Sequence, residues 1–180
     1  MRLFIAVEIP EEHKGYLREL QKKIKCDEAM MTFVRDFHLT LKFLGEVDEK
    51  KIDEIKGLID CADFKRFEAF VDDKIGFFPS EKNPRVIWLN IEPEEKFAEL
   101  KEIIDNKLEK LFVKDKNFKA HITLARIKFV KEKELFQKKI DEIKKNMLEK
   151  KHFAVDSFKL KRSVISRKGP EYEDVFVKKL

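Results

Sequence analysis

The sequence predicts an α+β fold with two lobes, each built from an antiparallel sheet and outer helices around a central cleft. Three observations lead to this prediction. Short apolar runs of strand type alternate with segments of helical period, and the second half of the chain repeats the first. The third observation is size, because 180 residues of which 43% are apolar suit one domain of two closely packed lobes.

The internal repeat joins segments that lie 83 residues apart. Residues 2–12 match residues 85–95, and residues 38–41 match residues 121–124 at the same offset without a gap. Later segments match at an offset of 84, as an insertion in a loop would produce. We therefore predict a single domain, residues 1–180, formed by duplication: two lobes related by a pseudo-two-fold axis, with approximate repeats 1–83 and 84–180.

The first repeat is expected to open with a strand over residues 3–9, where apolar and β-branched residues dominate. Pro10 and the two glutamates that follow it suit the first turn of a helix, because proline needs no donated amide there and carboxylates favour the positive end of the helix dipole. Helical periodicity predicts another helix over 48–60, and alternation predicts a long strand over 66–78.

The second repeat is expected to have the same order. It opens with a strand over 86–91, and an apolar stripe beginning at Phe97 predicts the helix that follows. The remaining predicted elements are a helix over 131–148, strands over 152–164 and 172–178, and turns over 78–84 and 166–170, the first turn being the boundary between the repeats.

Composition, charge and cysteine count exclude only a few classes of function. Charged residues make up 42% of the chain, but the net charge is only +5, which permits an anionic partner without requiring one. Cys26 and Cys61 form no CxxC pair, so neither a disulfide framework nor a zinc site is indicated. No apolar run has the length of a signal-peptide core or a membrane span, so we expect a cytoplasmic protein without a membrane role.

Two His-x-Thr triplets carry the strongest chemical signal. With 4 histidines and three threonines in the chain, such a triplet should arise by chance roughly 0.07 times, yet it occurs twice at equivalent positions. Alternate side chains of a strand share a face, so His38 points with Thr40 and His121 points with Thr123. Two imidazoles across a cleft can supply one proton and remove another, while the hydroxyls donate hydrogen bonds to an anion between them. This pattern favours in-line displacement at a phosphodiester.

The tandem motifs resemble the paired signature of the 2H phosphoesterase superfamily. The flanking segments are similar to one branch of it, the RNA 2′,3′-cyclic phosphodiesterases, which are also described as 2′-5′ RNA ligases. The segments that carry this resemblance are RLFIAV from Arg2, HLTLKFLG from His38, FFPS from Phe77, RVIW from Arg85, HITLAR from His121, and Arg162-Ser163.

The resemblance implies that a terminal 2′,3′-cyclic phosphate of RNA or an oligonucleotide is opened to a 2′-phosphate without a metal or other cofactor. In that family the first histidine is the proton donor and the second the proton acceptor, which would give these roles to His38 and His121; the pseudo-symmetric sequence itself does not distinguish them. Thr40 and Thr123 are expected to bind substrate beside them. Arg126 matches an arginine of the family's second motif, but simple alternation would aim it away from His121, so a bulge or bend is needed for it to reach a phosphate.

Other interpretations of the sequence stay open. A 5′ hydroxyl in place of water would give ATP-independent 2′-5′ RNA ligation with the same acid and base, and a non-catalytic RNA-end or nucleotide-binding module is the alternative from another class. We expect a monomer. His13 and His152 are expected in surface or packing positions, and most phenylalanines in the core, with Phe37, Phe77 or Phe118 as candidates to stack on a base.

Overall fold

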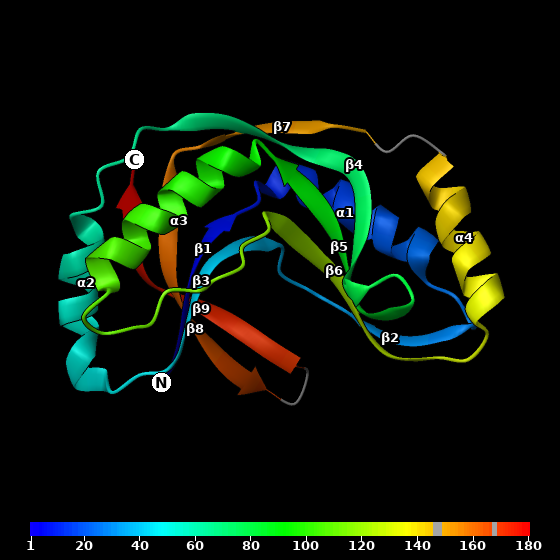
Figure 1. Ribbon diagram of the computed structural model, residues 1–180, viewed down its shortest axis with the longest axis horizontal. Helices are drawn as coiled ribbons and strands as arrows, with labels where there is room; N and C mark the ends of the chain where they lie inside the picture. Colours follow the sequence, from blue (N-terminus) through cyan, green and yellow to red (C-terminus); the bar gives the residue numbers. More distant parts are fainter. Residues whose placement is uncertain (146–148, 167–168) are drawn as a thin grey trace.

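The computed structural model describes residues 1–145, 149–166 and 169–180, which form two antiparallel sheets surrounded by helices (Figure 1). The predicted α+β class with two lobes is confirmed. Within the described residues, the first sheet has the strand order β3-β1-β8-β9 and the second has the order β2-β6-β5-β4-β7. The strands of the first sheet are β1 (Arg2–Glu8), β3 (His38–Glu46), β8 (Ser157–Ser166) and β9 (Gly169–Lys179). Those of the second are β2 (Ala29–Phe33), β4 (Phe67–Ser80), β5 (Asn83–Glu92), β6 (His121–Val130) and β7 (Lys151–Val155).

Helices α1 (Glu11–Ile24) and α3 (Glu94–Leu108) each follow a strand of one sheet and pack against the other sheet. Helix α1 follows β1, yet its Gln21 donates a hydrogen bond to the carbonyl of Leu124 in β6. Helix α3 follows β5, yet its Asp105 pairs with Lys42 in β3 at 2.6 Å. Figure 1 accordingly shows α3 with α2 (Ile52–Asp60) beside the first sheet, and α1 with α4 (Lys133–Lys145) beside the second. No helix in the described ranges is long and apolar enough to span a membrane.

The local signals for helix α1 were correct. The helix begins directly after Pro10, and Glu11 and Glu12 lie in its first turn. Of the apolar stripe that helical periodicity predicts here, Leu17, Leu20 and Ile24 are buried, and Tyr16 is half-buried. The helix expected over 48–60 forms as a 3-10 turn, Glu49–Lys51, that continues into α2.

Two predicted elements differ from the observed ones. The single strand expected over 152–164 is two strands, because β7 ends at Val155 in the second sheet and β8 begins at Ser157 in the first. Both pieces have the same two-residue period, so alternation cannot show where the chain changes sheet. The turn expected over 78–84 is much shorter, since β4 continues to Ser80 and β5 already begins at Asn83. Strand β2 was not predicted.

Parts of two predictions fall outside the described residues. The helix expected over 131–148 is observed as α4, Lys133–Lys145, and positions 146–148 are not among the described residues. The turn expected over 166–170 includes positions 167 and 168, which are not described either; Ser166 ends β8 and Gly169 begins β9. The strand expected over 172–178 lies within β9.

One pair of strand segments in the second sheet, β4 with β7, has internal symmetry. In the pairing of β4 with β7, Phe67 faces Val155 and Val71 faces Lys151. At the 84-residue offset of the repeat, position 67 corresponds to 151 and position 71 to 155. Replacing each residue of the first pair by its equivalent in the other repeat therefore gives the second pair. A pseudo-two-fold axis near Ala69 and Phe153 has this effect. The limits of the repeats, 1–83 and 84–180, stay a prediction.

The ungapped alignment of the first strands of the two repeats is wrong by one residue. In the ladder, Ala6 faces Thr40 in the first sheet, while Trp88 faces Thr123 in the second. The structural offset between β1 and β5 is therefore 82, whereas between β3 and β6 it is 83. A slip of one residue exchanges the two faces of a strand, so Trp88 lies on the face of the threonine rather than on the core face that the alignment with Ile5 would give it.

Candidate active site

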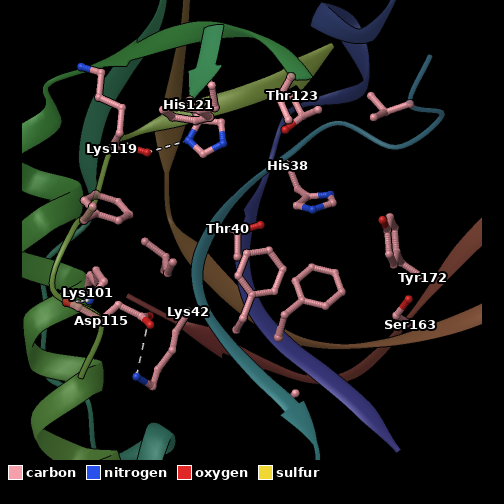
Figure 2. Close-up of a pocket in the computed structure, with 18 of the residues that line it drawn as sticks. His38, Thr40, Lys42, Lys101, Asp115, Lys119, His121, Thr123, Ser163 and Tyr172 are labelled. Atoms are coloured by element: carbon pink, nitrogen blue, oxygen red, sulfur yellow. Dashed lines mark hydrogen bonds and ion pairs between the residues drawn. The ribbon is translucent and has the colours of Figure 1, made fainter. Parts of the chain in front are cut away.

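The two His-x-Thr segments occupy the first residues of two strands that contact each other across the lobes. β3 begins at His38 and β6 begins at His121. In both strands the residue between histidine and threonine is buried in the core, while the histidine and threonine are only partly buried. All four side chains gather around one cleft of about 980 Å³ (Figure 2). The structure thus brings together the residues that the motif singled out, although their catalytic roles stay predictions.

A β-bulge follows each His-x-Thr segment. In the first sheet Thr40 faces Ala6 but Lys42 faces Ile5, which leaves Leu41 as the extra residue; in the second, Leu124 is the extra residue between Thr123 and Ala125. A bulge reverses the alternation beyond it. Arg126 therefore returns to the side of His121 and lines the cleft, which is the bend that the sequence argument required.

Backbone contact fixes the ring of His121. Its Nδ1 lies 2.7 Å from the carbonyl oxygen of Lys119, and because a carbonyl can only accept, Nδ1 carries the hydrogen (Figure 2). In the neutral ring Nε2 therefore holds the free lone pair. The ring also makes edge contacts with Phe78, at 4.9 Å between centroids, and with Trp88, at 6.0 Å. The carbonyl thus holds His121 in one tautomer, and the two aromatic rings restrict its orientation.

His38 lies in a different environment. Its ring is 5.1 Å from the ring of Phe4 and 5.1 Å from that of Tyr172, which meets it edge-on at 88°. Its Nδ1 is buried and has no hydrogen-bond partner among the described residues. No backbone contact of the kind made by His121 selects a tautomer for this ring.

Burial lowers the pKa of both histidines. The pKa of His38 falls from its ordinary 6.5 to about 4, because burial disfavours the cation and the charge of Lys161 adds to that effect, while Glu8 partly opposes it. The pKa of His121 is also lowered by burial, against the hydrogen bond to Lys119, which favours the cation. Arg126 lowers both pKa values. In the unliganded protein both rings are therefore mostly neutral at neutral pH.

The strands beside the two histidines carry different polar groups. Glu8 faces His38 in the ladder and forms ion pairs with Lys159, at 2.5 Å, and with the buried Lys161; both lysines also pair with Asp174 at 2.6 Å. The position facing His121 holds the buried, neutral Asn90, whose amide donates to Asp72 at 3.1 Å and to Glu92 at 2.8 Å. The first sheet thus places a four-charge network next to its histidine, and the second places a neutral amide there.

The aromatic residues of the cleft were mostly missed by the sequence argument. Of the three proposed stacking residues, Phe37 and Phe77 are buried in the core, and only Phe118 lines the cleft. Phe43, which is 65% exposed, lines the cleft at the position that corresponds to Arg126 in the second repeat. The repeat offset of 83 together with the shared bulge is the signal that could have found it. Tyr172 was missed because it lies on β9, far from either motif in the sequence.

One wall of the cleft is the segment between α3 and β6, anchored by buried charges. Lys42 of β3, only 2% exposed, pairs with Asp105 and donates to the carbonyl of Val113 at 2.9 Å. Lys101 also pairs with Asp105 at 2.5 Å. The same segment leads to Lys119, whose carbonyl holds His121, so these ion pairs fix the wall on which one catalytic candidate depends.

The other chemically notable residues lie apart from this arrangement. Cys26 is half-buried, Cys61 is exposed, and both are free thiols. His13 on α1 contacts the carbonyl of His152 at 2.8 Å in an exposed position, as expected for surface or packing roles. In the three described stretches of the chain, no group of three or more His, Cys, Asp or Glu residues is placed to hold a metal ion.

Two sheets that present paired His-x-Thr segments to one cleft have the arrangement expected of a 2H phosphoesterase. The profile of the LigT-like phosphoesterase family matches residues 7–88 and again residues 89–172. The chain belongs to this family and is a hydrolase with 2H phosphoesterase activity.

Individual relatives agree with this assignment. An RNA 2′,3′-cyclic phosphodiesterase of Archaeoglobus fulgidus is 33% identical over 180 residues, which cover 98% of this chain and 99% of the relative. One of Methanocaldococcus jannaschii is 34% identical, with 96% and 97% covered. The crystal structure of the Thermus thermophilus protein TT0787 superimposes with a TM-score of 0.80 at 32% identity, covering 100% of this chain and 98% of the other. Escherichia coli LigT complexed with 3′-AMP shares the fold at a TM-score of 0.77 and 24% identity, over 99% and 97% of the two chains.

Proposed function

We propose that the protein hydrolyses the 2′,3′-cyclic phosphate at an RNA end to a 2′-phosphomonoester, with His121 as general base and His38 as general acid. The observation that carries the proposal is the hydrogen bond from His121 Nδ1 to the carbonyl of Lys119, in the cleft that His38 also lines. It leaves one basic nitrogen, of defined tautomer, free to accept a proton beside a second imidazole. The names of the relatives, RNA 2′,3′-cyclic phosphodiesterase, support this choice of substrate.

Nε2 of His121 accepts a proton from the attacking water. The water oxygen forms a bond to phosphorus, and the proton moves to Nε2, which is unprotonated because Nδ1 already carries the hydrogen of the neutral ring. The lowered pKa of this ring keeps it in the neutral form that a base requires at neutral pH. The edge contacts of Phe78 and Trp88 keep the ring from rotating away.

His38 donates the proton that the leaving group needs. As the bond from phosphorus to the 3′ oxygen breaks, the 3′ oxygen takes a proton from the ring and becomes a hydroxyl, leaving the phosphate on the 2′ oxygen. In the unliganded protein the pKa of His38 is about 4, so the proton must come with or after the substrate. A phosphate anion between the two rings offsets the charges of Lys161 and Arg126, which raises the pKa of His38 and favours its acid form.

Thr40, Thr123 and Arg126 complete the site as phosphate contacts. The two hydroxyls share the cleft face with the imidazoles, so they are placed to donate to the non-bridging oxygens. Arg126 adds a guanidinium that stabilises the charge developing on those oxygens in the transition state. The protein needs no further group for this proton transfer, and we propose that the reaction does not depend on a metal ion.

A product analysis tests the proposal. The purified protein is incubated with an oligonucleotide ending in a 2′,3′-cyclic phosphate, in EDTA, with and without an oligonucleotide that has a free 5′ hydroxyl. We expect a 2′-phosphate as the product in both reactions. A 3′-phosphate would contradict the assignment of the leaving oxygen, activity only with an added divalent ion would contradict metal independence, and a joined product as the main species would indicate 2′-5′ ligation instead.

A further inference from the structure

The place of Arg126 depends on a single extra residue in β6. Leu124 and Ala125 are consecutive residues, and both are completely buried, whereas in a regular strand with one face on the cleft burial would alternate. Without the bulge, Arg126 would point away from the face that carries His121 and Thr123. Whatever stabilises the bulge therefore also decides whether this arginine reaches the cleft.

Leu124, the extra residue of the bulge, has no partner residue in β5, and its carbonyl is bonded on the other side of β6. The ladder between β5 and β6 passes directly from the pair of Trp88 and Thr123 to the pair of Ile87 and Ala125. Two other donors take up this carbonyl: the backbone amide of Val34, at 3.1 Å, and the side-chain amide of Gln21, at 2.8 Å. A buried carbonyl needs such partners because water cannot reach it.

Gln21 donates both hydrogens of its side-chain amide to backbone carbonyls at the bulge. The second hydrogen goes to the carbonyl of Val34 at 2.9 Å, so one side chain joins two backbone oxygens of the second lobe. Gln21 is only 8% exposed and comes from helix α1, 103 residues before Leu124. The apolar stripe of α1 already packs the helix against its neighbours, so packing alone does not call for a buried amide here.

We infer that Gln21 is a positioning residue for catalysis: it holds the bulge in β6 and thereby aims the guanidinium of Arg126 at the phosphate of the substrate. The inference rests on the proposed function, in which Arg126 contacts that phosphate. An amide suits the position because it offers two donors without a charge. A methionine of similar length offers no donor, and a lysine would bring an uncompensated charge to a buried site.

A double-mutant cycle between Gln21→Met and Arg126→Met tests the inference. The substrate is an oligonucleotide with a 2′,3′-cyclic phosphate, and Gln137→Met is the matched control, because Gln137 of α4 also donates from its amide, to Asp141, but lies outside the cleft. Gln21→Met alone should lower kcat/KM about tenfold, mainly through KM, as expected for a weakened charged hydrogen bond. Added to Arg126→Met it should change kcat/KM less than about twofold, since the residue through which it acts is gone. Gln137→Met should have no effect in either background.

Fully additive effects of Gln21→Met and Arg126→Met would overturn the inference, and so would an unchanged kcat/KM in Gln21→Met. If Gln21→Met does not fold, Gln21→Asn keeps the amide and shortens the reach by one methylene; it should give a smaller loss with the same dependence on Arg126.

A titration with inorganic phosphate, followed by isothermal titration calorimetry in the wild type and in each variant, separates this inference from the proposed function. If the wild-type protein does not open the cyclic phosphate, the proposed function fails, and the titration alone then tests whether Gln21 positions Arg126. Several-fold weaker phosphate binding in Gln21→Met than in Gln137→Met supports the inference. Equal binding in these two variants, or unchanged binding in Arg126→Met, rejects it.

Discussion

The two strands that carry the His-x-Thr segments, β3 and β6, share a motif and a bulge but place their histidines in different surroundings. Each starts with His-x-Thr-Leu, and each has its extra residue at the leucine. Beyond the bulge, β3 presents Phe43 to the cleft where β6 presents Arg126. A duplicated backbone thus supplies the symmetric placement of two imidazoles, and the residues around it make the two sites chemically unequal.

The inequality matters because one turnover needs one base and one acid. His121 has a fixed tautomer and a nearby backbone acceptor, which suits a base. Nδ1 of His38 has no partner within the described part of the chain, and the ring lies beside the network of Glu8, Lys159, Lys161 and Asp174, where its protonation depends on nearby charge. In the proposed mechanism the asymmetry of roles comes from these surroundings, the carbonyl of Lys119 at one ring and the charges of Lys161 and Glu8 near the other, rather than from the motif.

The largest expected effect comes from removing either imidazole. His121→Ala and His38→Ala should each lower kcat by about 10²–10⁴-fold, because each removes a proton-transfer group. A substrate with sulfur at the bridging 3′ position should separate the roles, since a thiolate leaves with little need for a proton. Single-turnover kinetics on this substrate should show activity restored in His38→Ala but not in His121→Ala. Equal restoration in both variants would contradict the assignment of acid and base.

The pH dependence of the rate tests the charge difference between the two sites. With unperturbed histidines, a bell centred between about pH 5 and 8 would be expected. Burial lowers both pKa values, that of His38 to about 4, so the bell of kcat/KM, which reports the free protein, should be displaced to lower pH. The bell of kcat should lie at higher pH, because bound phosphate favours the cation of His38. Coincident bells for the two parameters would show that the substrate does not change the protonation of the pair.

A feature of this comparison could be predicted where its signal lies within one segment of the sequence, and could not where it depends on a partner strand. Local alternation and the repeat were enough to place His38, Thr40, His121 and Thr123 on facing strands. The bulge was not predictable, because an extra residue in a ladder is defined by its partner strand, and the approach of Arg126 to the cleft depends on it.

The residues that face the two histidines on the neighbouring strands could not be predicted for the same reason. Register decides that Glu8 faces one histidine and Asn90 the other, and the ungapped alignment gave a register that was wrong by one residue. The packing of helix α1 against the second sheet could not be predicted either. An apolar stripe indicates that a helix is buried but not which sheet it packs against.

The stability of the protein should report the buried state of His38 independently of catalysis. A folded-state pKa of about 4 against an unfolded value near 6.5 means that the unfolded chain binds more protons between these values, so stability is lost as the pH falls through this window. The full loss is about 3 kcal/mol. In urea unfolding at pH 7 and pH 4.5, His38→Asn should lose less stability between the two pH values than the wild type does. His13→Asn, on the exposed side of α1, is the control, and a wild-type loss that matches that of His38→Asn would refute the lowered pKa.

The smallest expected effect tests the aromatic contact that Trp88 of the second sheet makes with His121. A Cβ added at Gly76 of β4 would lie 2.1 Å from the Trp88 ring, so Gly76→Ala must displace the indole that contacts His121. We expect a destabilisation of about 1–3 kcal/mol, as for other overpacked sites, together with a lower kcat, because the displaced ring no longer holds the base in place. Gly57→Ala is the matched control: nothing lies within 4 Å of its added Cβ, and in helix α2 the substitution should stabilise the protein by roughly 0.5–1 kcal/mol. Urea unfolding gives the stabilities, and steady-state hydrolysis gives the kcat. If Gly76→Ala loses stability but keeps its kcat, the indole packs the second sheet without orienting His121, and the difference between the two sites lies in the nearby charges and in the carbonyl of Lys119.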